Sequence, residues 1–198
     1  LSKMAEIIGR DHTELDAYLS GLYTKLQTRY NQGTYWSSDT QTGNAMALDF
    51  DLVPPEQKDQ IVERLVKNVT DYGSLRTGVL GTLSLYNALS EANEHKVLLD
   101  VTTTDKKCSF GYMLDDGATT LWEYWDRAGE GFNSLGANGV NILACWDSQN
   151  HCMFGGGLTS WMFQGLGGIR STAAAYHEIT FRPGLESELT SASSTIHT

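Results

Sequence analysis

The 198-residue chain has few cysteines, few basic residues and no long hydrophobic run. Its three cysteines are odd in number and lack metal-ligand spacing, which argues against a disulfide framework or a zinc site. With 14 basic and 24 acidic residues the net charge is −10, and clustered Lys and Arg needed for nucleic acid are missing. No apolar run approaches the roughly 18 residues of a membrane span. We therefore expect no nucleic acid and no membrane as partners.

The cysteines and one sequon bear on the compartment. Cys145 and Cys152 bracket a polar loop and could pair in an oxidising environment. The alternative is that both, with Cys108, are small half-buried hydrophobes. Asn68 begins an Asn-Val-Thr triplet, which fits the N-glycosylation pattern. The compartment stays open, although the sequon favours an extracellular location.

The first half of the chain has the periodicity of helices. Apolar residues recur at helical spacing after Asp11 and again after Pro55, each time on an otherwise polar segment. Pro54 interrupts the helical pattern just before the segment that follows Pro55. We expect helices over 1–8, from Asp11 to about Tyr30, over 41–52, after Pro55, over 82–90, over 95–101 and over 158–169. Short links between them predict antiparallel helical hairpins.

The residue composition changes twice in the second half of the chain. Four of the five tryptophans lie between residues 108 and 161, among glycines, where helices should be short. Residues 177–182 alternate as a strand does, and Pro183-Gly184 follows as a turn. This ending resembles the start of a β-rich module.

One segment has a composition suited to sugar chemistry. Glu123 stands between Trp122 and Trp125, with Asp116 close by in the sequence. Indole faces stack on the apolar faces of a pyranose, and a carboxylate beside them can activate water or donate a proton. The alternative is a surface helix start with ordinary aromatic packing, and the residues alone leave both open.

Five ordered segments resemble the α-L-rhamnosidases of glycoside hydrolase family 78. Together they run through nearly the whole chain. They are Gln41–Leu48 with the Leu-Val-Pro that follows, Gly73–Thr82, Gly111–Met113 with Gly117–Trp125, Asn150–Gly155, and Trp161–Ile169.

The resemblance implies a mainly α fold. We expect residues 1–175 to be the C-terminal portion of an (α/α)6 six-hairpin barrel catalytic domain. Residues 176–198 would begin a C-terminal β-sandwich domain, which is incomplete here. The family's general acid lies in an acidic motif upstream of the matched segments, so we expect the N-terminal half of the barrel to be a required partner, in the same polypeptide or as a separate chain.

The resemblance also implies a mechanism and a site. The family inverts the anomeric centre: one carboxylic acid protonates the leaving oxygen while a carboxylate about 6.5–9.5 Å away activates water. Glu123 matches the general base, and no cofactor or metal is needed. The implied substrate-binding residues are Trp122, Trp125, His151, Asp116 and Thr77.

The expected function is release of terminal α-L-rhamnose from glycosides or polysaccharides. Two alternatives remain beside it. One is a non-catalytic carbohydrate-binding or structural protein derived from the same barrel. The other is a related glycosidase or lyase that acts on another sugar.

Overall fold

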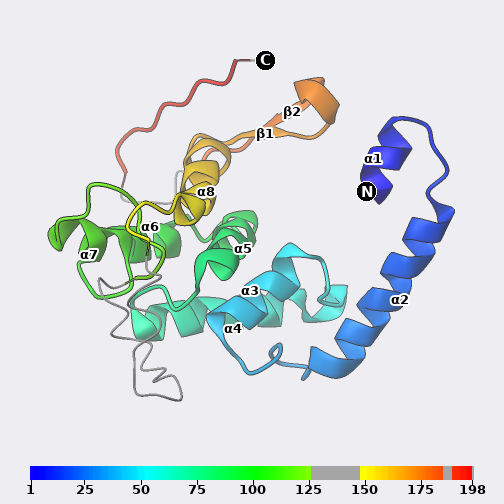
Figure 1. Cartoon of the computed structure of the whole chain (residues 1–198), viewed down its shortest axis with the longest axis horizontal. Coiled ribbons are helices and arrows are strands. Elements are labelled where there is room, and N and C mark those ends of the chain that lie inside the picture. The colour runs from blue at the N-terminus through cyan, green and yellow to red at the C-terminus, as the bar shows by residue number, and fades with distance from the viewer. Residues whose placement is uncertain (126–147, 185–188, 198) are drawn as a thin grey trace.

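The computed structural model describes residues 1–125, 148–184 and 189–197, and these are mainly helical (Figure 1). In this part of the chain no helix is both long and apolar enough to cross a membrane. The elements, in chain order, are α1 (Ser2–Ile7), α2 (Thr13–Tyr30), α3 (Gln41–Asp49), η1 (Pro55–Gln57), α4 (Lys58–Tyr72), α5 (Val79–Glu91), α6 (His95–Thr103), α7 (Phe110–Asp115), α8 (Met153–Ser160), the π-helical turn η3 (Trp161–Leu166), β1 (Ile169–Ser171), η4 (Ala174–Tyr176) and β2 (Ile179–Phe181).

Helices α3, α5 and α8 lie side by side and run in the same direction. A Cβ added to Gly81 in the first turn of α5 would meet Thr42 in the first turn of α3 at 2.8 Å. A Cβ added to Gly157 in α8 would meet Leu83 of α5 at 3.0 Å.

At the other ends of the helices, Asn87 of α5 donates to Asp49 of α3 at 3.0 Å, and Tyr86 of α5 contacts the ring of Trp161, which follows α8. Because early turns meet early turns and late turns meet late turns, the N-terminal ends of the three helices lie at one end of the molecule.

Helices α4 and α6 pack behind this layer. The stripe predicted after Pro55 supplies the contact, because Ile61, Leu65 and Val69 of α4 are fully buried. Gly73 ends α4 in the left-handed conformation, with a φ of 61°, which glycine adopts at little cost. Successive helices from α3 to α6 thus lie alternately in the two layers, as the predicted antiparallel hairpins require.

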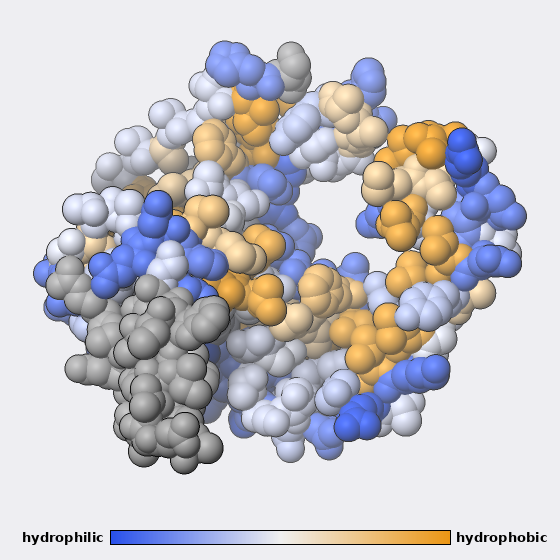
Figure 2. All heavy atoms as spheres, in the orientation of Figure 1, coloured by the Kyte–Doolittle hydropathy of each residue, from blue (hydrophilic) through white to orange (hydrophobic). Residues whose placement is uncertain are grey.

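Helices α1 and α2 extend away from the other helices (Figure 1). None of the residues of α2 is buried, and Tyr18, Leu19 and Leu22 are exposed. The C-terminal end of α2 is attached to the core, where Leu26 packs and Gln27 donates a hydrogen bond to the Leu52 carbonyl at 2.8 Å. Figure 2 shows hydrophobic side chains gathered along α1 and α2, across an opening from the other helices.

The C-terminal hairpin pairs β1 with β2 in antiparallel register, Ile169 opposite Phe181. Ile169 was expected to end a helix, and that expectation is wrong: Gly168, with a φ of 71°, ends the helical path one residue earlier. Arg170 fastens the hairpin to α5, donating hydrogen bonds to the Glu91 carboxylate and to Ser90. The proposed domain boundary at 175/176 falls in η4 between the two strands, and it stays a prediction.

The predicted mainly α six-hairpin fold class is confirmed, with a short sheet near the C-terminus. The expected helices over 1–8, after Asp11, over 41–52 and after Pro55 correspond to α1 to α4. Helix α7 was not predicted.

Candidate active site

The candidate residues gather where α3, α5 and α8 begin. Thr77 precedes α5, His151 precedes α8, and Gln41 is the first residue of α3. Helix N-termini present free N–H groups and a partial positive charge, which favour oxygen-rich or anionic ligands. This end of the molecule therefore collects polar groups from segments far apart in the sequence.

Two paired segments hold Glu123 and His151. The Glu123 amide donates to the Ser148 carbonyl at 2.8 Å, and the His151 amide donates to the Leu121 carbonyl at 2.7 Å. The Ser148 amide in turn donates to Oε2 of the Glu123 carboxylate at 3.2 Å. Glu123 is half-buried, so its carboxylate is anchored at one oxygen while the residue keeps access to solvent.

His151 has an unused polar atom. Its Nδ1 is buried and makes no hydrogen bond within the described residues. A buried polar atom without a partner costs free energy, about 1–3 kcal/mol, and such atoms often mark ligand sites.

Trp122 and Trp125, on either side of Glu123 in the sequence, are both buried. The Trp125 indole N–H donates to the Thr77 carbonyl at 2.6 Å. The same ring meets Phe110 edge to face, with ring centroids 5.3 Å apart. Trp125 thereby joins the segment that carries Glu123 to the loop before α5.

Thr77 contributes its backbone to the site. Its side chain is buried and shares a 2.8 Å hydrogen bond with the Thr82 hydroxyl. Because the single hydroxyl hydrogen of Thr82 goes to the Gly78 carbonyl, Thr77 is the donor in that pair. Substrate binding by Thr77 stays a prediction.

Asp116 directly follows α7, where its amide donates to the Tyr112 carbonyl at 3.0 Å. In the described part of the chain no hydrogen bond joins its side chain to Glu123, His151 or the tryptophans, and its binding role also stays a prediction. The disulfide considered between Cys145 and Cys152 involves a residue outside the described ranges.

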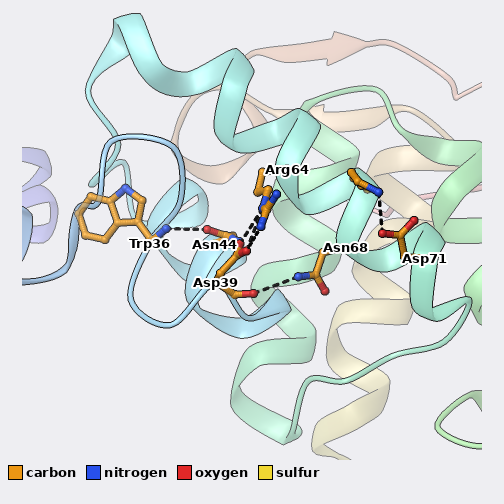
Figure 3. A network of polar contacts seen from close by, with 7 residues as sticks. Trp36, Asp39, Asn44, Arg64, Asn68 and Asp71 are labelled. Atoms are coloured by element: carbon orange, nitrogen blue, oxygen red, sulfur yellow. Dashed lines mark hydrogen bonds and ion pairs between the residues drawn. The ribbon is translucent and has the colours of Figure 1, made fainter.

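A polar network fixes the loop before α3 (Figure 3). Asn44 accepts a hydrogen bond from the Trp36 amide at 2.8 Å and donates to Asp39 at 3.1 Å. Arg64 of α4 forms a bidentate ion pair with Asp39, and this hydrogen bonding holds the pKa of the Asp39 carboxyl below its usual value. The loop is thereby tied to both α3 and α4.

Asn68 belongs to the same network. Its side-chain amide donates to the Asp39 carbonyl at 3.0 Å from the middle of α4, where the residue is half-buried. N-glycosylation at Asn68 stays a prediction.

A cavity of about 720 Å³ lies at the opposite end of α3, α5 and α8. It is lined by Asp49, Asn87, Glu91, Gln164 and Arg170 among others, and by none of the candidate residues. We place the site at the end where α3, α5 and α8 begin, because the Glu123 carboxylate is held there by the Ser148 amide and the buried Nδ1 of His151 has no partner among the described residues. Among the described residues no group of three or more His, Cys, Asp or Glu side chains could hold a metal ion.

Three residues of this end were given no role from the sequence. Phe110 supports Trp125, Ser148 binds the Glu123 carboxylate, and Gln41 binds the loop before α5. Gln41 is the first residue of a predicted helix and of one of the five family-like segments. A polar residue at that position is the sequence feature that could have indicated its role. The other two depend on contacts between distant segments.

The helical hairpins in two layers are the fold of the six-hairpin glycosidases. The family model of the bacterial alpha-L-rhamnosidase 6 hairpin glycosidase domain matches residues 1–166. The chain belongs to this family, the alpha-L-rhamnosidase family of glycoside hydrolases.

Individual relatives agree with the family. The chain is 31% identical to an alpha-L-rhamnosidase of Formosa agariphila over 100% of its own length and 21% of the relative's. It is 30% identical to one of Streptomyces avermitilis, with coverages of 98% and 18%. The chain thus spans about a fifth of the length of these curated relatives.

Solved structures share the fold. The structure of Streptomyces avermitilis alpha-L-rhamnosidase complexed with L-rhamnose superimposes with a TM-score of 0.77 at 28% identity, covering 92% of this chain and 17% of that one. Aspergillus terreus alpha-L-rhamnosidase gives 0.74 at 26% identity, covering 90% and 20%.

Proposed function

We propose that this chain forms the general-base side of an inverting glycosidase that releases terminal α-L-rhamnose from glycosides or polysaccharides. The observation that carries the proposal is the setting of Glu123: it is half-buried, its sequence neighbours Trp122 and Trp125 are buried, and one of its carboxylate oxygens is bound by the Ser148 amide. An oriented carboxylate that still reaches solvent suits a base that removes a proton from water.

In this mechanism the Glu123 carboxylate deprotonates a water molecule, which attacks the anomeric carbon from the face opposite the leaving group. The glycosidic oxygen leaves with a proton from a general acid, which we assign to the partner part of the barrel. His151, through its unused Nδ1, would bind a sugar hydroxyl, and the tryptophans would offer an apolar wall to the methyl group of rhamnose.

The remaining part of the barrel is the proposed partner. The exposed apolar residues of α2, among them Tyr18 and Leu22, are what a helix pairing with α2 would cover. Relatives about five times as long as the chain supply the length for such helices. The proposed occupant of this face is therefore the rest of the catalytic barrel.

The decisive variant is Glu123→Gln in protein that carries the complete barrel. It keeps the size of the side chain and an oxygen for the Ser148 amide, but it cannot take a proton. Loss of a general base costs about 10²–10⁴-fold, so kcat on p-nitrophenyl α-L-rhamnoside should fall by that factor while rhamnose binding persists. Asp115→Asn, a change of an exposed carboxylate on α7, is the matched control and should leave kcat unchanged.

NMR of the released sugar tests the stereochemistry. The wild type should release β-L-rhamnose first, because water attacks opposite the leaving group. Near-normal turnover in Glu123→Gln would refute the assignment. A wild type that binds rhamnose without turnover would instead indicate the non-catalytic alternative.

A further inference from the structure

Gln41 is a buried polar side chain with both ends of its amide in use. It is the first residue of α3, and 1% of it is exposed. Its Nε2 donates to the Ser74 carbonyl at 3.1 Å, and its Oε1 accepts from the Arg76 amide at 2.7 Å. Gln41 thus clamps the backbone of the loop that leads into α5.

The clamped loop meets Trp125 at the next residue. Thr77 follows Arg76 directly, and its carbonyl is the acceptor for the Trp125 indole at 2.6 Å. The Thr77 hydroxyl is fixed by Thr82 as well, so this carbonyl has little freedom to turn. The Trp125 ring also contacts Phe110 in an edge-to-face arrangement.

Trp125 stands two residues after Glu123 in the segment paired with Ser148. A shift of the Thr77 carbonyl would move the indole, and the indole would move the backbone on which the carboxylate stands. A displacement of about 1 Å at a reacting group can cost about 10²-fold in rate. The position of the general base therefore depends on contacts that begin at α3.

We propose that Gln41 is a positioning residue for Glu123, acting through the loop 74–77 and the Trp125 indole. The inference rests on the proposed function and adds a residue to it. Glutamine fits the position because the Ser74 carbonyl needs a hydrogen-bond donor and the Arg76 amide needs an acceptor. An ionised Glu offers acceptors alone, and Leu offers neither.

The test uses protein with the complete barrel. In Gln41→Leu we expect kcat on p-nitrophenyl α-L-rhamnoside to fall about 10–100-fold, with a smaller change in KM. Gln27→Leu is the matched control: it also removes a glutamine that donates from a helix to a distant carbonyl, that of Leu52, but on α2. It should leave kcat unchanged.

Two further readouts separate positioning from a general loss of structure. The indole ¹⁵N–¹H resonance of Trp125, identified by its absence in Trp125→Phe, should shift in Gln41→Leu and stay in place in Gln27→Leu. In Gln41→Glu, protonation of the new carboxyl restores a donor for the Ser74 carbonyl. The ratio of its activity to that of the wild type should therefore rise as the pH falls.

An unmoved Trp125 resonance in folded Gln41→Leu would overturn the inference, whatever the activity. So would a wild-type kcat in Gln41→Leu when Glu123→Gln is inactive. If Glu123→Gln is itself active, the proposed function fails and the catalytic role of Gln41 fails with it. The indole shift then still reports separately whether Gln41 sets the place of Trp125.

Discussion

Replacing Gly157 with alanine would test how closely α5 and α8 approach each other. An added Cβ would lie 3.0 Å from Leu83 Cα and 3.3 Å from the Thr82 carbonyl oxygen. These are backbone atoms of a neighbouring helix, and they cannot rotate away as the end of a side chain could. The two helices would have to separate by a few tenths of an ångström.

Two effects of opposite sign decide the outcome. Alanine is favoured over glycine inside a helix by about 1 kcal/mol. Overpacking a well-filled contact costs about 1–3 kcal/mol. Gly157→Ala should therefore lower the free energy of unfolding by about 0–2 kcal/mol in net terms.

Gly156 provides the matched control in the same helix. A Cβ added there meets nothing within 4 Å, so Gly156→Ala keeps the gain in helix propensity without the clash. The difference between the two variants isolates the packing cost, about 1–3 kcal/mol.

Equilibrium unfolding in urea of protein that carries the complete barrel would measure both variants. The midpoint of Gly156→Ala should lie above that of the wild type, and the midpoint of Gly157→Ala at or below it. Equal stabilisation by both substitutions would refute the close approach of α5 and α8.

Two other predictions concern acid stability and the α2 face. Because Arg64 lowers the folded-state pKa of Asp39 from 3.8, the stability from this pair is present above about pH 4 and is lost as the pH falls through the lowered pKa. Asp39→Asn should therefore flatten the loss of unfolding free energy on acidification, whereas Asp71→Asn, at an exposed ion pair, should not; equal slopes would contradict this. The 198-residue chain alone should bind a hydrophobic dye and unfold without a sharp transition, because α2 is uncovered. A cooperative monomer in gel filtration and calorimetry would contradict the need for the rest of the barrel.

Local chemistry explains which parts of the fold the sequence predicts. The two prolines before α4 and the glycine after it mark the ends of that helix, and its apolar stripe identifies the buried face. Helix α7 has only 6 residues, and a single serine cap is weak evidence for a helix in a sequence, so the sequence does not predict it. Ile169 has the pattern of a helix residue, but pairing with Phe181 decides its conformation.

In the candidate site, too, some features can be predicted from the sequence and others depend on the packed fold. Glu123 and the tryptophans form one short segment, so a role in sugar chemistry can be proposed for them from adjacent residues. The partners Ser148 and Thr77 lie far from them in the sequence, and only the packed fold shows those contacts. The role inferred for Gln41 likewise needs the parallel packing of α3 and α5, which periodicity does not specify.

The C-terminal hairpin has a consequence for where the helical unit can be cut. The Gly184 amide donates to the Gly165 carbonyl at 2.9 Å, and a Cβ at Gly184 would meet the His95 ring at 2.6 Å. Gly184, which follows β2, thus forms part of the wall around the buried ring of His95. A fragment that ended at residue 175 would lose this part of the wall and leave the His95 ring less covered. For expression or domain grafting, the smallest unit that keeps this corner intact extends through residue 184.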